Sequence, residues 1–374
     1  MELYEPNALR NIALIGHGGA GKTAVADAIL WVAGAVDRLG SADKGTSVFD
    51  YEEDERQRQH SINLAVGHCI WRNTLVTIID TPGGPDFVGD AYASLRVVDG
   101  VVLVVDATTG VEVQTERLWA KAREYGLPGI VFINKLDSDQ VDYEQVLNQL
   151  RERLKVAPVP LYAPWDEGGN FKGIVSVVTE KAFTFDERGQ PQEQELPAEL
   201  SGMIAQRKEG LVEAAAEGND ELLEKYIEGE QLTDDEIRQG IMDAVRAGVA
   251  TPIVCGAATL SAGIAFLLDA IIDYIPSPAE REPIEARIPG DGETVTVTAD
   301  TQEPFAALVF KTVTDPYVGR INYFRVFSGM VHSDSQVLNA NEQRRERIGQ
   351  LLILQGKNVE PIGLASAGQI AAVA

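Results

Sequence analysis

The chain has 374 residues, 45% of them hydrophobic and 24% charged, a composition typical of a globular protein with two or three domains. Its formal charge of −25 argues against a general nucleic-acid-binding protein, DNA-binding proteins included, and its two cysteines exclude a disulfide framework. No stretch approaches the roughly 18 continuous apolar residues of a membrane span, and the first residues lack the basic and apolar parts of a secretory signal. We therefore expect a cytoplasmic protein without a membrane partner, in which Cys69 and Cys255 are buried, reduced thiols.

Residues 10–160 alternate short apolar runs with helical patterns, which predict strands and helices in turn. Continuous apolar strands that alternate with helices are typical of a parallel sheet covered on both faces. A strand at 251–255 and a helix at 262–275, ended by Pro276 and Pro278, extend the same domain. The earlier strands are expected at 12–15, 75–79, 101–105 and 130–133, and the earlier helices at 22–33 and 113–125.

An acidic segment separates these two groups of elements. Residues 163–250 hold 20 Asp and Glu against 8 Lys and Arg. A turn signal at Asp186–Gly189 predicts a hairpin, a helical run is expected from about 198 to 227, and Thr233 begins another helix with a capping box. The segment from about 160 to 250 is therefore predicted to be an α+β subdomain inserted in the first domain.

The pattern changes after Pro283. Strands at 306–310 and 321–327 are rich in β-branched and aromatic residues, and turn signals separate the strands of this region at 315–316, 328–329 and 339–341. We expect an all-β barrel domain at 287–374, after a first domain at 1–282. Since the chain stops at 369–374 in what reads as the middle of a strand, we also expect this domain to be cut short and the sequence to be a fragment.

Eight residues after the first predicted strand match G-x-x-x-x-G-K-T, the phosphate-binding loop. Four glycines let the backbone curl around an anion, and the following helix adds the positive end of its dipole. We expect Lys22 to reach the β- and γ-phosphates, Thr23 to place its hydroxyl on Mg²⁺, and His17 to act structurally or through its backbone. The loop predicts a nucleoside triphosphate site formed by Gly16, His17, Gly18, Gly19, Ala20, Gly21, Lys22 and Thr23.

A second motif, D-T-P-G, follows the strand predicted at 75–79. By itself this tetrapeptide is as typical of a turn as of a site. After a phosphate loop, however, a carboxylate at the tip of the neighbouring strand can hold Mg²⁺ through water, and a glycine N–H can meet the γ-phosphate. We assign these roles to Asp80 and Gly83, with Thr81, Pro82 and Gly84 completing the loop.

A third motif, N-K-x-D, follows the strand predicted at 130–133. The Asp137 carboxylate can accept two hydrogen bonds from N1 and N2 of guanine, a pair of donors that adenine lacks. Asn134 can tie this loop to the phosphate loop, and the Lys135 stem can lie on the purine face. In this order the three motifs predict a GTP-binding domain, with Asn134, Lys135, Leu136 and Asp137 at the base.

With these motifs in this order, the chain resembles the elongation factor G family over essentially all of its length. The resemblance also covers the acidic insertion with residues 171–175, the segment 255–258, and Asp315–Arg320 in the second domain. It implies an α/β P-loop GTPase domain with the inserted subdomain, followed by the β-barrel domain. It further implies GTP or GDP with Mg²⁺ as ligands, and a last guanine loop formed by Gly256, Ala257 and Ala258, with the Ala258 N–H on the base O6.

The resemblance implies a monomeric GTPase that acts on the ribosome, with ribosomal RNA and stalk proteins as partners. Its reaction is the hydrolysis of GTP to GDP and phosphate, slow without the ribosome, in translocation or in ribosome release and recycling. Two alternatives stay open: a GTPase of the ribosomal-protection type, and a slowly hydrolysing, GTP-dependent ribosome-binding module.

Departures from the family pattern gather around hydrolysis. Gly84 stands where the family has a histidine that positions the attacking water. Gly18 and His60 stand where apolar residues gate that histidine, and Gly19 replaces an aspartate. The first switch segment of the family aligns with residues 58–62, so that Ser61 takes the place of the Mg²⁺-binding threonine. Phosphoryl transfer depends mainly on positioning, so slower hydrolysis with intact GTP binding is expected.

The catalytic candidates are therefore Lys22, Gly83, Gly84 and His60, and the metal candidates are Thr23, Ser61 and Asp80. One hypothesis is that the His60 imidazole compensates for Gly84; the alternative is an exposed loop histidine. His68 and Trp71 are expected on a strand, as core or sheet-face residues. The run Arg344–Arg347 is compatible with ribosomal RNA contact or with a solvated strand edge.

Overall fold

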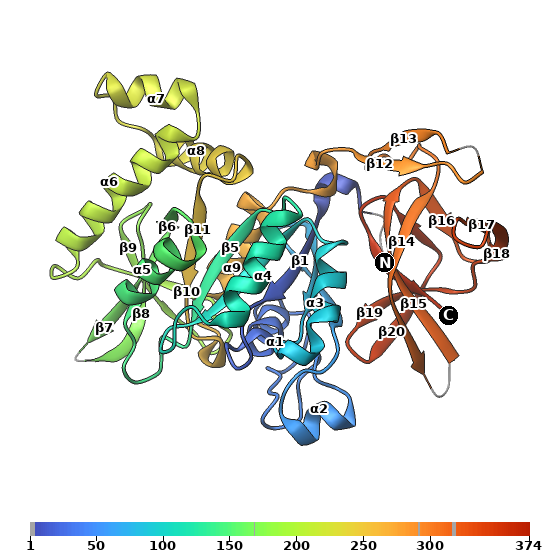
Figure 1. Cartoon of the computed structure of the whole chain (residues 1–374). Helices are drawn as coiled ribbons and strands as arrows, with labels where there is room; N and C mark the ends of the chain where they lie inside the picture. The colour runs from blue at the N-terminus through green and yellow to red at the C-terminus, as the bar shows by residue number, and fades with distance from the viewer. Residues whose placement is uncertain (1–3, 168, 291, 316–318) are drawn as a thin grey trace.

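The computed structural model describes residues 4–167, 169–290, 292–315 and 319–374, and Figure 1 shows their arrangement. A mixed sheet with helices on both faces forms the central part. A β-rich part, orange to red, adjoins one edge of this sheet, and the inserted segment, green to yellow, adjoins the other. Within the described ranges, no helix is both long and apolar enough to cross a bilayer. The predicted fold class, an α/β domain followed by a β-rich domain, is confirmed.

The central sheet has the order β2-β3-β1-β4-β5-β11-β6. All neighbouring pairs are parallel except β2 and β3, which a two-residue turn joins as a hairpin. The strands predicted for the parallel sheet, now β1, β3, β4, β5 and β11, are mutually parallel; β2 adds an antiparallel edge, because Arg72 and Asn73 both adopt positive φ, the conformation of a tight hairpin turn. The strands are β1 (Leu9–Ile15), β2 (Ala65–Trp71), β3 (Thr74–Asp80), β4 (Gly100–Asp106), β5 (Gly129–Asn134), β6 (Pro158–Pro160) and β11 (Thr251–Cys255).

Two helices cover one face of this sheet and three cover the other. α1 (Lys22–Val32) and α9 (Ile264–Tyr274) pack against each other on one face. On the opposite face lie α3 (Val88–Leu95), α4 (Val113–Glu124) and α5 (Tyr143–Leu154). The strands and the inner faces of the helices are buried as predicted, including Cys69 and Cys255 as free thiols. Short elements complete this part: α2 (Glu53–Arg58), η1 (Pro6–Ala8), η2 (Pro85–Phe87), η3 (Ala258–Leu260) and η4 (Pro278–Glu280).

The inserted segment combines a four-stranded antiparallel sheet with three helices. The sheet has the order β10-β9-β8-β7, and the predicted hairpin joins β9 to β10. The single helix predicted at 198–227 is wrong, because the chain breaks at Gly218 and Asn219 caps a new helix by accepting from two backbone N–H groups. The elements are β7 (Tyr162–Glu167), β8 (Asn170–Ser176), β9 (Lys181–Phe185), β10 (Pro191–Gln194), α6 (Ser201–Glu217), α7 (Asp220–Ile227) and α8 (Asp234–Arg246).

Strands are the only regular secondary structure among the described residues of the second domain. Its main sheet has the order β14-β15-β22-β19-β20, and three two-stranded ladders surround it. Position 316 of the predicted turn at 315–316, and residues 316–318 of the segment Asp315–Arg320, lie outside the described residues. The strands are β12 (Ile284–Arg287), β13 (Thr294–Val297), β14 (Ala306–Asp315), β15 (Gly319–Ser328), β16 (Met330–His332), β17 (Gln336–Asn339), β18 (Arg344–Arg347), β19 (Leu351–Gln355), β20 (Asn358–Ile362), β21 (Leu364–Ser366) and β22 (Ile370–Val373).

Candidate nucleotide-binding and catalytic site

The phosphate loop connects the end of β1 to the start of α1, as the sequence predicts. Two of its glycines are required by their surroundings as well as by their positive φ values of 145° and 91°. A Cβ at Gly16 would lie 2.4 Å from the Val104 carbonyl oxygen, and one at Gly21 would lie 2.4 Å from Asn134 Nδ2. Gly19 also has a positive φ but faces open space. The loop conformation therefore depends on glycine at several positions.

Lys22 lies inside the curve of this loop. Its Nζ donates to the carbonyl oxygens of Gly16, at 3.1 Å, and His17, at 2.9 Å. Burial lowers the pKa of this amine. Gly83 approaches from β3 so closely that a Cβ there would lie 2.4 Å from Lys22 Nζ and 2.6 Å from the Gly18 nitrogen. The structure thus brings Lys22, Gly18 and Gly83 together, and only glycine fits at position 83.

Three oxygen-bearing side chains meet beside this lysine. Thr23 Oγ1 donates to Asp80 Oδ2 at 2.7 Å and lies 3.0 Å from Ser61 Oγ. The other carboxylate oxygen, Asp80 Oδ1, is buried and has no hydrogen-bond partner among the described residues. Burial raises the pKa of Asp80, and the nearby Asp50 carboxylate raises it further. Two hydroxyls and a carboxylate with an unpartnered oxygen are the hard ligands that suit Mg²⁺.

The N-K-x-D loop is fixed to the phosphate loop through Asn134. Its Nδ2 donates to the Ala20 carbonyl at 3.0 Å, and its Oδ1 accepts from the Ala258 N–H at 3.0 Å. The second bond occupies the Ala258 N–H, the group that the resemblance assigns to the base O6. Asp137 is exposed, and its Oδ2 accepts from Thr259 Oγ1 at 2.8 Å. The Leu136 N–H donates to the Gly256 carbonyl at 3.1 Å, which joins both predicted base loops.

Lys135 also has a partner that the sequence did not reveal. Its Nζ lies 2.7 Å from Asp106 Oδ2, and the opposite oxygen of Asp106 accepts from Thr108. These hydrogen bonds lower the pKa of Asp106, although burial acts in the opposite direction. The ion pair holds the lysine stem beside the predicted base position. One feature of the sequence could have identified Asp106 as a site residue: it ends the apolar strand β4, at the same sheet edge as Asp80 and Asn134.

Gly84 and His60 both lie beside Phe87. Gly84 has φ −76° and ψ 141°, an ordinary extended conformation, and a Cβ there would lie 3.2 Å from the Phe87 ring. The imidazole of His60 is exposed, with its centroid 6.2 Å from that of Phe87. Backbone geometry therefore does not require glycine at position 84. The segment directly after Ser61 is held by Glu55, whose Oε1 accepts from the N–H groups of Ile62 and Asn63.

The weaker candidates have structural partners. His17 Nε2 lies 3.5 Å from Glu112 Oε1 at the start of α4. His68 lies within β2 and Trp71 ends it, as predicted, and the Trp71 indole donates to Asp269. The arginines of β18 are exposed, and two of them pair with Glu346 and Asp334.

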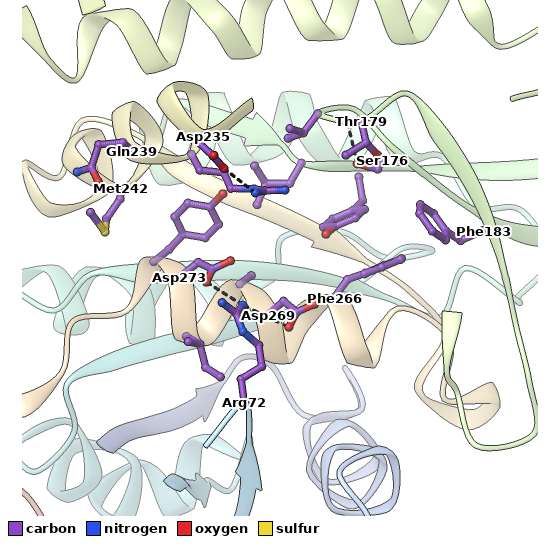
Figure 2. Close-up of a pocket in the computed structure, with 17 residues that line it drawn as sticks. Arg72, Ser176, Thr179, Phe183, Asp235, Gln239, Met242, Phe266, Asp269 and Asp273 are labelled. Atoms are coloured by element: carbon purple, nitrogen blue, oxygen red, sulfur yellow. Dashed lines mark hydrogen bonds and ion pairs between the residues drawn. The ribbon is translucent and has the colours of Figure 1, made fainter. Parts of the chain in front are cut away.

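A cavity of about 600 Å³ lies elsewhere, between α8, α9 and the inserted sheet (Figure 2). Phe266 stacks on Tyr162 in its apolar wall, at a ring separation of 4.4 Å. Its charged groups are paired internally: Arg72 contacts Asp269 and Asp273, and Arg238 contacts Asp235 (Figure 2). The described residues that line it include none of the predicted site residues, so it is separate from the nucleotide-binding candidates.

Comparisons with known proteins show which families the two domains match. A family model described as elongation factor Tu GTP binding domain matches residues 7–277, and one described as elongation factor G domain 2 matches residues 304–374. Elongation factor G of Thermotoga neapolitana is 38% identical over 366 residues, 97% of this chain and 53% of that protein. A crystal structure of a Thermus thermophilus protein has a TM-score of 0.85 at 31% identity, covering 97% of this chain and 52% of that one.

This chain spans about half the length of both relatives. The family match covers the phosphate loop, the D-T-P-G and N-K-x-D loops and the whole inserted segment. The chain therefore belongs to the family of GTPases with an elongation factor Tu GTP-binding domain, and an elongation factor G second domain follows that domain.

Proposed function

We propose that this chain binds GTP with Mg²⁺ at the edge of the central sheet and hydrolyses it to GDP and phosphate. The observation that carries the proposal is the meeting of Thr23, Ser61 and Asp80, with hydrogen-bonding distances of 2.7 and 3.0 Å and one carboxylate oxygen that is unpartnered within the described chain. These residues would hold Mg²⁺, which supplies positive charge to the β- and γ-phosphates when bound. The working unit is the domain at 1–282, with its insertion at about 160–250, and the second domain at 287–374.

Lys22 and the loop backbone would bind the phosphates. The Lys22 amine contacts two loop carbonyls and would exchange them for phosphate oxygens, while the Gly83 N–H would donate to the γ-phosphate. The base would be read by Asp137, oriented by Thr259, with Asn134 and Lys135 fixing its loop. The exchange of GTP for ATP tests this assignment, because tighter binding of ATP than of GTP would contradict it.

The activity is proposed to be that of an elongation factor of the G type, acting on the ribosome in translocation or in release and recycling. Ribosomal RNA and stalk proteins are the proposed partners, and a monomer in the cytoplasm is the proposed state. The match of both domains to elongation factor families supports this proposal. A ribosomal-protection role uses the same GTPase parts and remains the alternative within this class.

A second candidate function follows from Gly84, which offers no side chain to position the attacking water. In that case the chain would be a slowly hydrolysing, GTP-dependent ribosome-binding module. Turnover of GTP with and without ribosomes separates the two functions. Strong stimulation by ribosomes favours the elongation factor and excludes the pure binding module, whereas ribosome binding with GTP and unchanged turnover favours the module.

We further propose that His60 supplies the missing imidazole, because Phe87 adjoins both His60 and Gly84. The alternative is an exposed histidine without a role in catalysis. Ribosome-stimulated turnover of His60→Ala decides between them. General acid–base residues contribute typically about 10² or more in rate, so a loss of that order supports the proposal and an unchanged rate refutes it.

A further inference from the structure

Several groups of contacts join the second domain to the GTPase domain, including hydrogen bonds from β2 to Leu354 and Gln355, and two of these groups matter for the proposed site. The first is a buried anchor around Asp99. Arg325 of β15 donates to Asp99 Oδ1 at 2.6 Å and to the Val97 carbonyl at 2.9 Å. Asn11 of β1 donates to Asp99 Oδ2 and to the Gly368 carbonyl, at 2.7 and 2.8 Å. Arg325, Asp99 and Asn11 are almost completely buried, so this anchor ties the second domain to the rigid sheet.

The second group centres on Lys311 of β14. Its side chain is only 9% exposed, and its Nζ lies 2.6 Å from Asp90 Oδ2 and 3.3 Å from Asn63 Oδ1. The same Asp90 oxygen accepts from the Leu64 N–H at 2.7 Å. A register shift in β14, between Val309 and Lys311, lies directly beside this lysine; such bulges redirect side chains. One carboxylate thus joins the second domain to two segments of the GTPase domain.

Both of these segments continue into the proposed Mg²⁺ and γ-phosphate site. Asn63 and Leu64 follow Ser61, whose hydroxyl lies 3.0 Å from Thr23. Asp90 lies on α3, which follows Gly83 and Gly84 through the short helix η2. The anchor at Asp99 involves neither segment. A movement of Ser61 or Gly83 would therefore stretch or break the contacts of Lys311 with Asp90 and Asn63, while the anchor at Asp99 keeps the second domain in place.

We propose that Lys311 is a positioning residue, through which the second domain holds both segments in the arrangement that favours GTP over GDP. This inference rests on the proposed function, since it assumes that Ser61 and Gly83 contact Mg²⁺ and the γ-phosphate. A largely buried amine needs its carboxylate partner, so separating Asp90 from Lys311 leaves an uncompensated charge. The arrangement therefore favours two discrete states, with both segments closed on Lys311 or the lysine released to water.

Thermodynamic linkage between the Lys311 contact and nucleotide binding gives a measurable consequence. If the contact of Lys311 favours the GTP arrangement, its removal must weaken GTP binding relative to GDP binding. If Lys311 only stabilised the fold, its removal would lower the affinities for GTP and GDP equally or leave both unchanged. The ratio of the two affinities therefore distinguishes a positioning role from a structural one.

The experiment uses the full chain with Mg²⁺ and two fluorescent probes, a labelled GDP and a labelled, non-hydrolysable GTP analogue. In Lys311→Met we expect the analogue to bind at least about fivefold more weakly while GDP affinity changes less than about twofold, within the range typical of coupling between sites. Lys311→Arg keeps the charge and should preserve the wild-type ratio. Lys357→Met, at an exposed lysine of the same domain, is the matched control and should leave both affinities unchanged.

Asp90→Asn removes the other charge and serves if Lys311→Met does not fold. It should reproduce the selective loss, and adding Lys311→Met to it should cause little further change, because both act on one contact. Equal loss of both affinities, or an unchanged ratio in Lys311→Met and Asp90→Asn, would overturn the inference while the wild type still binds both probes. A wild type that binds neither probe would instead refute the proposed function itself.

Discussion

Asp27, on α1 one turn after Thr23, offers a direct test of the electrostatics around the site. The residue is 1% exposed; its Oδ1 accepts from the Val48 N–H at 2.9 Å, and its Oδ2 is buried without a partner in the described part of the chain. Burial raises the pKa of this carboxyl from 3.8 to about 6, although hydrogen bonds from Val48 and Ser47 act in the opposite direction. The native state therefore holds the Asp27 proton more tightly than the unfolded chain does.

The sign of the effect follows from this difference. An acid with a raised native pKa destabilises the native state when it ionises, so stability is lost as pH rises from 3.8 through 6. The full cost above pH 6 is the difference between 3.8 and about 6 multiplied by about 1.36 kcal/mol per pKa unit, or about 3 kcal/mol. Roughly 1.4 kcal/mol of this cost arises between about pH 5 and about pH 7.5.

The perturbation is Asp27→Asn, which keeps an oxygen for the Val48 N–H and removes the ionisation. The assay is urea unfolding of wild type and variant at several pH values, with nucleotide and Mg²⁺ concentrations held fixed. The pH-independent cost of burying an amide cancels when only the change with pH is compared. We expect the wild-type free energy of unfolding to fall by about 1.4 kcal/mol relative to the variant from about pH 5 to about pH 7.5. Parallel pH curves for the two proteins would refute this reasoning.

Three further predictions concern the base, the reaction and the domain interface. Asp137→Ala should weaken GTP binding at least about tenfold, because it removes a charged acceptor worth about 1.5–3 kcal/mol per hydrogen bond. ATP binding in a competition assay should change far less, and an equal loss for both nucleotides would contradict the assignment. Gly84→His should raise ribosome-stimulated GTP turnover at least about tenfold, since the backbone there is extended and a positioned base contributes about 10² or more. Gly84→Ala is its control, and equal rates in the two variants would argue against a missing histidine. Arg325→Met should lower the free energy of unfolding by about 3 kcal/mol, because it leaves the buried Asp99 without its closest cation. Arg345→Met, at an exposed arginine of β18, should change it by less than about 0.5 kcal/mol in the same denaturation assay, and a similar small change in Arg325→Met would show that the anchor is weak.

Much of the candidate site could be read from local sequence, because each motif directly follows a strongly apolar strand. The loop at 16–23, Asp80 and Asn134 all meet at one edge of the sheet, since the carboxyl ends of its parallel strands point the same way. Asp106 lies at the same edge and escaped notice because no motif surrounds it. The hydrogen bond of the Ala258 N–H to Asn134 was not predicted, because Asn134 lies 124 residues earlier in the chain.

Two features of the fold, the break in the helical run and the antiparallel strand β2, were not predicted because each depends on backbone conformations at one or two residues. The helix predicted at 198–227 has continuous helical propensity, but the capping bonds of Asn219 favour a break. The antiparallel β2 depends on two positive φ values in a turn between apolar strands, which periodicity does not detect.

By itself, then, the sequence determined that an α/β part precedes a β-rich part, where the three candidate nucleotide-binding loops lie, and that glycine stands at positions 18, 19 and 84. Those features depend on short-range patterns of apolar residues, glycines and charges. Tertiary structure alone decided which side chains share a contact across long stretches of chain. The carboxylate of Asp90 meets Lys311 across 221 residues, and Arg325 meets Asp99 across 226. Packing of the two domains brings these groups together and buries the cations, each of which then needs a carboxylate to offset its loss of water, and no periodicity along the chain encodes that proximity.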